Sequence, residues 1–139
     1  MRYLCNNETM NNSVQWVLRI GVAGEFIGHG MFALQGKAEW VGWIVQFLGV
    51  TADHATIILR CIGVVDQVVA GIVLFAPIPA VLLWAVLCGS WTALLRPLVG
   101  ESVWEFVARW PNWAGPLALL MMGWPKKSVK AWFSPIIFK

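Results

Sequence analysis

The hydrophobic positions of this chain form long runs that are nearly free of charge, separated by shorter segments rich in Gly, Pro and Trp. A helix needs ~20 apolar residues to cross the hydrocarbon core of a bilayer. The runs predict membrane-spanning helices over residues 14–34, 55–76, 78–95 and 111–124. The fourth run is short unless part of the preceding segment enters the membrane with it. Pro77 and Pro79 leave a very short link, so the second and third helices should form an antiparallel hairpin.

Two further segments are apolar but too short to cross a bilayer at 1.5 Å per residue. In residues 37–50 the less apolar positions recur three and four apart, which produces a narrow polar stripe on an apolar helix; they are Glu39, Gly42, Gln46 and Gly49. Trp40 and Trp43 would anchor this helix in the interface. Residues 101–110 (ESVWEFVARW) predict a second interfacial helix. Asp53 is a candidate N-cap for the second spanning helix, and Pro116 a candidate kink in the fourth.

Composition places the chain in a membrane: 59% of its 139 residues are hydrophobic, 12% are charged and the mean hydropathy is +0.70. We therefore predict an all-α fold, an integral membrane four-helix bundle with short interfacial amphipathic helices. The expected organisation is a polar segment at residues 1–13, the four-helix domain at 14–124 and a basic tail at 125–139. Residues 129–138 of that tail should lie along the inner membrane surface.

Orientation follows from the lysines, because cytoplasmic segments carry an excess of Lys and Arg. The lysines after the last spanning helix are Lys126, Lys127, Lys130 and Lys139. They predict a cytoplasmic C-terminus, and four crossings then place the N-terminus inside as well. Residues 1–13 lack the features of a signal peptide, so the first helix is expected to stay in the mature protein.

The same totals limit the partners. A net charge of +3 is too small to indicate nucleic acid, so lipid and other membrane subunits are the expected partners. The localisation expected is a prokaryotic cytoplasmic membrane. Cys5, Cys61 and Cys88 form no CxxC and no close pair, and we interpret them as free thiols.

Ionisable residues inside the spanning helices are the candidate chemistry. Arg19 and Arg60 are each followed six residues later by an acid, Glu25 or Asp66, and His29 lies one turn beyond Glu25. A charge within hydrocarbon is costly, at roughly 2.5 to 3.5 kcal/mol, and is usually paired inside the protein. In antiparallel helices these groups reach similar depths, so we expect one network; it comprises Glu25, His29, Arg60 and Asp66, with Arg19 and Gln67 at its edge.

This network admits a structural and a functional interpretation. It either fixes how the helices pair, or it binds a ligand or protons. Replacing Arg60 alone should then be more harmful than replacing Arg60 and Asp66 together, because an uncompensated acid remains. His29 would hydrogen-bond a neighbour, contact a quinone or other headgroup, or ligate haem iron. Haem ligation is the least favoured of these roles, since the only other histidine, His54, precedes the second helix. Metal binding by Glu25 and His29 would need more ligands than these two side chains.

Small residues predict where helices approach closely. Gly21, Gly24 and Gly28 include a GxxxG step in the first helix, and Ala85, Gly89 and Ala93 form a small-xxx-small face on the third. The third helix carries no charge over residues 78–95, so its expected role is packing. No nucleophile, base and orienting acid can be named as a catalytic set, and we expect no catalytic activity of the chain alone.

The first spanning helix has an Arg, then glycines and a Gly-His-Gly before an aromatic residue, and a short amphipathic piece and three more helices follow it. This pattern resembles the DoxX-like family of small bacterial and archaeal membrane proteins. The matching residues are Arg19, Gly21, Gly28, His29, Gly30, Phe32, Arg60 and Gly71. The resemblance covers about residues 14–122. It implies a four-helix bundle that serves as an accessory subunit of a redox complex linked to quinones. The rival hypothesis is an independent small-molecule or proton transporter that uses the same charged cluster.

Overall fold

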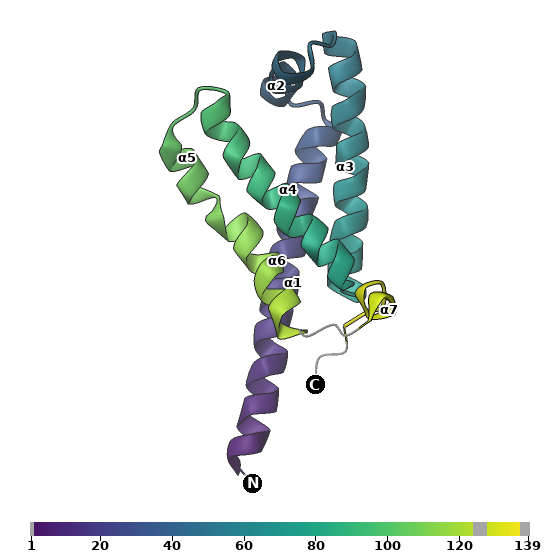
Figure 1. Ribbon diagram of the computed structural model, residues 1–139, viewed down its shortest axis with the longest axis vertical. Coiled ribbons are helices and arrows are strands. Elements are labelled where there is room, and N and C mark those ends of the chain that lie inside the picture. Colours follow the sequence, from purple (N-terminus) through teal and green to yellow (C-terminus); the bar gives the residue numbers. More distant parts are fainter. Residues whose placement is uncertain (1, 124–127, 137–139) are drawn as a thin grey trace.

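The computed structural model describes residues 2–123 and 128–136, with side chains from residue 12 onward, and within these ranges it contains helices and no strand. The helices are α1 (Arg2–Leu34), α2 (Ala38–Leu48), α3 (Ala52–Phe75), α4 (Pro79–Leu98), α5 (Val103–Ala108), α6 (Trp110–Met122) and α7 (Val129–Trp132) (Figure 1). Three of them contain a stretch long and apolar enough to cross a membrane, namely Asn12–Leu34, Ala52–Phe75 and Pro79–Leu98. The all-helical fold and three predicted spans are thus confirmed, whereas the fourth is not.

The first helix begins earlier than predicted, at Arg2 instead of residue 14. Residues 2–13 contain no Gly or Pro, so nothing in the backbone ends the helix where the apolar run begins. The cap of α3 also differs from the prediction. Thr51, not Asp53, is its N-cap, and the Thr51 hydroxyl accepts a hydrogen bond from the backbone N–H of His54 at 3.4 Å.

Helices α1 and α3 run antiparallel and approach most closely at two glycines. A Cβ on Gly63 would lie 2.8 Å from the carbonyl oxygen of Gly30, which is closer than real Cβ atoms come to a backbone atom. The predicted contacts at Gly21, Gly24 and Gly28 are wrong, because a Cβ at any of them would meet nothing within 4 Å. A GxxxG step marks a face on which a helix can approach, but the crossing of α3 selects the turn at Gly30 instead.

The small-residue face of α4 packs as predicted. Ala85 and Ala93 are fully buried, and a Cβ on Gly89 would lie 2.7 Å from the carbonyl oxygen of Asn112 in α6. Helices α5 and α6 return along α4, and both contact it. Between them the helix is interrupted at Arg109, because the ring of Pro111 lacks an N–H and clashes with the preceding turn. Helix α6 continues through Pro116, where a kink was expected.

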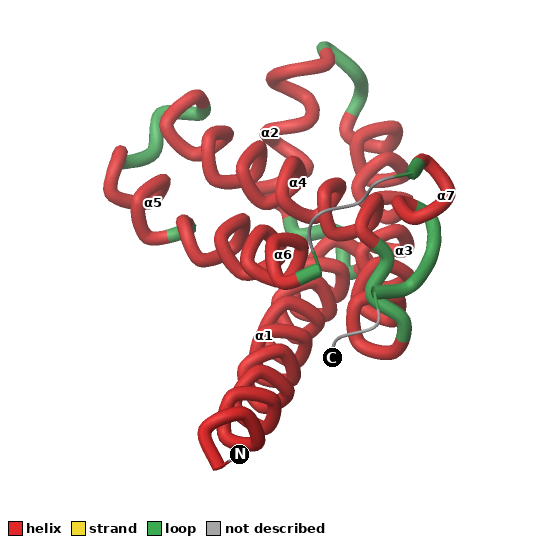
Figure 2. The backbone as a smooth tube through the Cα atoms, turned by 60° about the horizontal axis from the view of Figure 1, so that its bottom comes forward, coloured by secondary structure: helices red, strands yellow, loops and turns green. Residues whose placement is uncertain are grey.

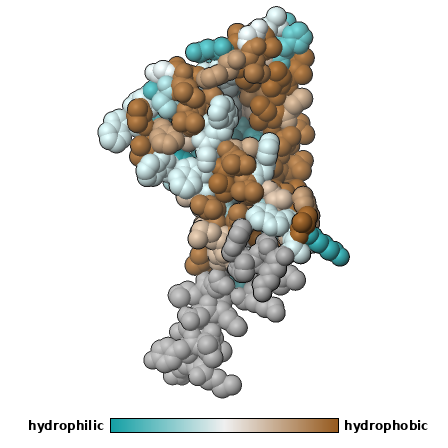
Figure 3. Space-filling model, in the orientation of Figure 1, coloured by the Kyte–Doolittle hydropathy of each residue, from teal (hydrophilic) through white to brown (hydrophobic). Residues whose placement is uncertain are grey.

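The bundle is tightly packed at one end and open at the other. Its core lies toward the α3–α4 turn; it includes Val22 and Phe26 of α1, Val69 and Val73 of α3, Leu82 of α4 and Leu119 of α6. From that turn α4 inclines away from α3, so the two helices diverge toward the end where α2 and α5 lie (Figure 1). Apolar residues dominate the surface along α3, and hydrophilic ones gather near α2 (Figure 3). These exposed apolar faces suit contact with lipid.

The described part of the tail closes the packed end. Ile136 is buried in the core, and its N–H donates to the carbonyl oxygen of Pro77 at 2.8 Å. Helix α7 consequently lies beside the α3–α4 turn (Figure 2). The described tail folds back on the bundle through Ile136, while Phe133 stays exposed. That residues 129–138 lie along the membrane surface stays a prediction. Lys126, Lys127 and Lys139, which carried the orientation argument, lie outside the described residues.

Candidate functional site

A cavity of about 690 Å³ occupies the open end of the bundle. Helices α1, α3 and α4 form its walls, α2 covers it, and Arg109 contributes from the break between α5 and α6. Several apolar side chains that line it are also exposed on the outside, among them Ile62 and Val65 of α3 and Trp84 and Trp91 of α4. The cavity is therefore open between α3 and α4.

Helix α2 lies over the cavity because of its amphipathic pattern. Trp40, Trp43 and Phe47 from one side of the helix line the cavity, whereas the predicted polar stripe is exposed. Gly49 ends the helix at φ +63°, a left-handed conformation that suits glycine. The chain then turns directly into α3. The segment predicted to lie in the interface is thus a lid on the site, and Trp40 and Trp43 stack with ring centroids 6.3 Å apart.

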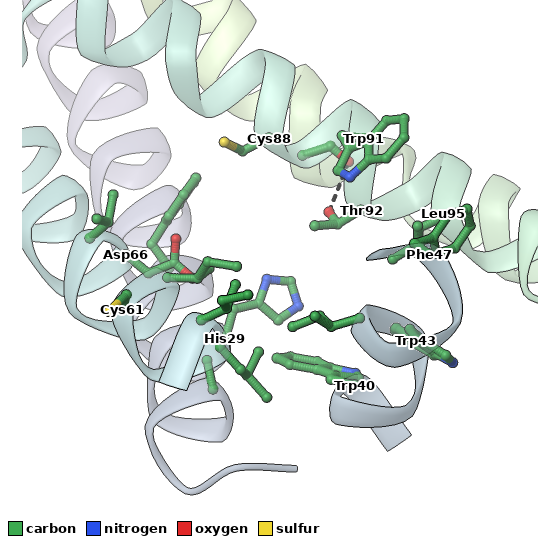
Figure 4. Close-up of a pocket in the computed structure, with 18 of the residues that line it drawn as sticks. His29, Trp40, Trp43, Phe47, Cys61, Asp66, Cys88, Trp91, Thr92 and Leu95 are labelled. Atoms are coloured by element: carbon green, nitrogen blue, oxygen red, sulfur yellow. Dashed lines mark hydrogen bonds between the residues drawn. The ribbon is translucent and has the colours of Figure 1, made fainter. Parts of the chain in front are cut away.

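Three of the predicted cluster residues meet in this cavity. Glu25 and His29 of α1 and Asp66 of α3 all line it, and the imidazole of His29 points into the space (Figure 4). The distance from His29 Nδ1 to Glu25 Oε1 is 3.9 Å, which is too long for a hydrogen bond. The imidazole packs instead against the indole of Trp40 in an edge arrangement, with centroids 5.7 Å apart. Within the described residues no hydrogen bond or ion pair holds the Asp66 carboxylate.

Arg60 does not belong to this cluster. Its side chain is exposed and does not line the cavity, so the predicted network through Arg60 is wrong. The antiparallel pairing was correct, but residue 60 falls on a face of α3 that α1 does not cover. Gln67 does contact α1, since its Nε2 donates to the carbonyl oxygen of Ile27 at 3.1 Å. Gln67 therefore joins the two helices beside the cavity.

Arg19 is buried at the opposite, packed end of the molecule. Its Nε donates to the carbonyl oxygen of Val73 at 3.2 Å, and its Nη2 donates to that of Leu74. Both carbonyls belong to the last turn of α3, where no intrahelical donor remains. A cation at a helix C-terminus is also favoured by the helix dipole. Arg19 thus caps α3. It takes no part in the polar network, at whose edge the sequence predicted it.

Two arginines that sequence reasoning missed stand at the rim of the cavity. Arg96, in the last turn of α4, is buried, and its Nη1 donates to both carboxylate oxygens of Glu101 at 3.0 and 2.9 Å. Arg109 lies at the α5–α6 break, with Nη2 3.5 Å from Glu105 Oε2 and a buried Nε that has no hydrogen-bond partner among the described residues. Glu101 follows Arg96 by five residues, and Glu105 precedes Arg109 by four. This spacing of opposite charges was the signal in the sequence that could have identified the two arginines.

The guanidinium of Arg96 also lies over the indole of Trp43, 4.6 Å from the ring centroid. This contact ties the end of α4 to the lid helix α2. On the outer side of α2, Lys37 Nζ pairs with Glu39 Oε2 at 2.9 Å, and that hydrogen bond holds the pKa of Glu39 below its usual range. The rim therefore has its own ion pairs, separate from the acids inside.

The donor set does not form a metal centre. Among residues 2–123 and 128–136, no group of three or more His, Cys, Asp or Glu side chains is arranged to hold a metal ion. His54 lies at the start of α3 with its Nδ1 2.8 Å from Thr51 Oγ1. Cys61 and Cys88 are free thiols on the cavity wall. Comparison with models of known protein families, with curated proteins and with solved structures finds no match to this chain.

Proposed function

We propose that this chain is a small accessory subunit of a quinone-linked redox complex in a prokaryotic cytoplasmic membrane, and that it holds the quinone headgroup in its cavity. The observation that carries the proposal is the cavity itself, which is mainly apolar, is open between α3 and α4 and contains a few converging polar groups. Its volume lies within the ~300 to 1,000 Å³ of small-molecule sites. The resemblance to DoxX-like proteins, which include such subunits, agrees with this function.

A quinone suits both the shape and the chemistry of this site. Its planar ring would stack on Trp40 or Trp43, and its oxygens would lie within reach of His29 and the rim arginines. A lipid-soluble molecule would enter through the opening between α3 and α4 without crossing water. The chain has few residues outside its helices, so electrons would have to come from partner subunits in the same complex.

The proposal includes four crossings with both termini in the cytoplasm. Helices α5 and α6 are individually too short to span, but residues 103–122 together make about 30 Å of helix at 1.5 Å per residue. Both helices follow α4, and α6 also packs on α1. The fourth crossing would then be a broken helix, and Arg109 at the break would turn toward the cavity and not toward lipid.

Purification in a mild detergent tests this function. Organic extraction of the purified chain, followed by chromatography, should recover a quinone in about equimolar amount, and partner subunits should co-purify. Trp40→Leu should lose the quinone, whereas Trp104→Leu, a matched change at an exposed tryptophan that does not line the cavity, should retain it. Recovery of a free monomer with neither quinone nor partners would contradict the proposal.

One observation favours a second candidate, the independent transporter. The break at Arg109 lies in the cavity wall, and discontinuous membrane helices form the substrate sites of many transporters. Liposomes that contain only this chain decide between the two. Uptake of a solute or of protons without any other protein would favour transport, and inert liposomes would favour the accessory subunit.

A further inference from the structure

The charges around the cavity do not balance. Two guanidinium groups and four carboxylates belong to the site and its rim; they are Arg96, Arg109, Glu25, Asp66, Glu101 and Glu105. Each arginine already contacts an acid at the rim, Glu101 or Glu105. With His29 counted as neutral, the two acids inside the cavity are left over. Lys37, a further cation whose charge acts on His29, is paired with Glu39 outside the cavity.

Carboxylates at membrane depth need a proton or a cation near them. A Ca²⁺ or Mg²⁺ ion is a poor candidate, because it takes six or more oxygen ligands at short distances. Glu25 and Asp66 lie on different helices, and the described residues offer no third acid beside them. The remaining wall of the cavity is mostly aromatic and aliphatic, and its polar members are His29, Cys61, Cys88, Thr92 and the two rim arginines. Such a wall excludes a small hydrated ion.

Aromatic rings line the same cavity as the two acids. Trp40, Trp43 and Phe47 of α2 lie on one side of the cavity, and Trp91 of α4 lies on the other (Figure 4). Trp84 lines it at a further turn of α4. The faces of such rings attract organic cations, and the attraction is about 2 kcal/mol or more where water is excluded. Acids on one wall and indoles on the others therefore suit a positive centre that carries apolar groups.

We infer that the cavity binds a lipophilic organic cation, with its positive centre near Glu25 and Asp66 and its apolar groups against the tryptophans. The cation enters from the lipid between α3 and α4, where Ile62, Val65 and Trp91 border the opening. This inference goes beyond the proposed function and does not require a quinone. The rim arginines do not prevent binding, because each is already compensated by its own acid.

Binding of the cation competes with protons. The titratable and charged groups around the two acids are His29 on α1, Cys88 on α4 and Arg109 at the α5–α6 break, while Arg96 and Lys37 act on His29. His29 Nδ1 lies 3.9 Å from Glu25 Oε1, and within the described residues no Arg or Lys forms an ion pair with Glu25 or Asp66. When the pH falls, the two acids become protonated and their attraction for the cation is lost. Affinity should therefore decrease steadily toward acidic pH.

Equilibrium dialysis of the purified full chain in a nonionic detergent tests the inference, with radiolabelled tetraphenylphosphonium as the probe. We expect saturable binding that weakens as the pH is lowered, because protonation removes the charge of each carboxylate. Glu25→Gln and Asp66→Asn should each lower the affinity about tenfold or more, since each removes a charge in a dry site. The double variant should not bind. Asp53→Asn, a matched change at an exposed position on α3, should bind normally.

A neutral probe of similar shape, triphenylphosphine oxide, separates charge recognition from simple partitioning. It should bind the wild-type chain weakly and without pH dependence. Absence of saturable phosphonium binding, equal affinity for both probes, or full affinity in a folded double variant would each overturn the inference. If the acid variants do not fold, the pH series and the neutral probe on the wild-type chain decide. Phosphonium binding by a chain that retains no quinone would support this inference and count against the proposed function.

Discussion

The Nε of Arg19 donates a hydrogen bond to the carbonyl oxygen of Val73 over 3.2 Å, and this contact joins the first span to the last turn of α3. The guanidinium also lies over the indole of Trp16, 4.2 Å from the ring centroid. A charged side chain near the membrane is thus held by backbone carbonyls and an aromatic face instead of by an acid. Arg19 is a structural residue, and this role has consequences for mutation.

Replacing Arg19 by Leu should destabilise the fold. The carbonyl oxygens of Val73 and Leu74 would lose their donors, which typically costs about 1 to 3 kcal/mol in the free energy of unfolding. Thermal unfolding in detergent micelles measures this loss. Arg60→Leu is the matched control, and it should change stability little because Arg60 is exposed. A larger effect at Arg60 than at Arg19 would instead support the network that the sequence predicted.

Replacing Gly89 by Ala should disturb the contact between α4 and α6. The added Cβ would lie 2.7 Å from the carbonyl oxygen of Asn112, and a backbone atom cannot move aside as a side chain can. Such overpacking typically costs about 1 to 3 kcal/mol. Gly24→Ala, on an open face of α1, should be tolerated. The melting temperatures of the two variants test the difference, and equal values would contradict the observed packing.

The pair formed by Arg96 and Glu101 should behave as one unit. Arg96→Leu removes a buried guanidinium whose Nη1 donates to both carboxylate oxygens of Glu101. Glu101→Gln leaves that guanidinium without its charged partner. The double variant should lose less stability than the sum of the single variants, with a coupling of about 1 to 3 kcal/mol. A double-mutant cycle on unfolding measures it. Strict additivity would show that the pair contributes nothing.

The proposed four crossings predict which ends of the helices are accessible from outside. In a background without native cysteines, single cysteines at Ala52 and Gly100 should react with an impermeant reagent added to intact cells. A cysteine at Ser128 should react only after the membrane is opened. If residues at positions 100 and 128 react from the same side, α5 and α6 do not cross together, and the chain has three crossings.

The sequence by itself determined which segments are helices and which of them suit a membrane. Apolar runs of sufficient length predicted the spans in α1, α3 and α4, and prolines near residue 78 predicted the turn between α3 and α4. These features depend on local composition and backbone chemistry, so residues that are neighbours along the chain determine them. The small-residue face around Gly89 was also predictable, because three small residues at helical spacing leave a groove that a helix can fill.

Only the tertiary structure decided which charged residues meet. Arg19 and Arg60 each precede an acid by six residues, yet one caps a helix and the other is exposed. The direction in which each points depends on how α1 rotates against α3, and the contact at Gly30 and Gly63 sets that rotation. The cavity arises because α4 diverges from α3 and α2 covers the gap. No local pattern encodes that divergence, since it results from the packing of helices that are distant in the sequence.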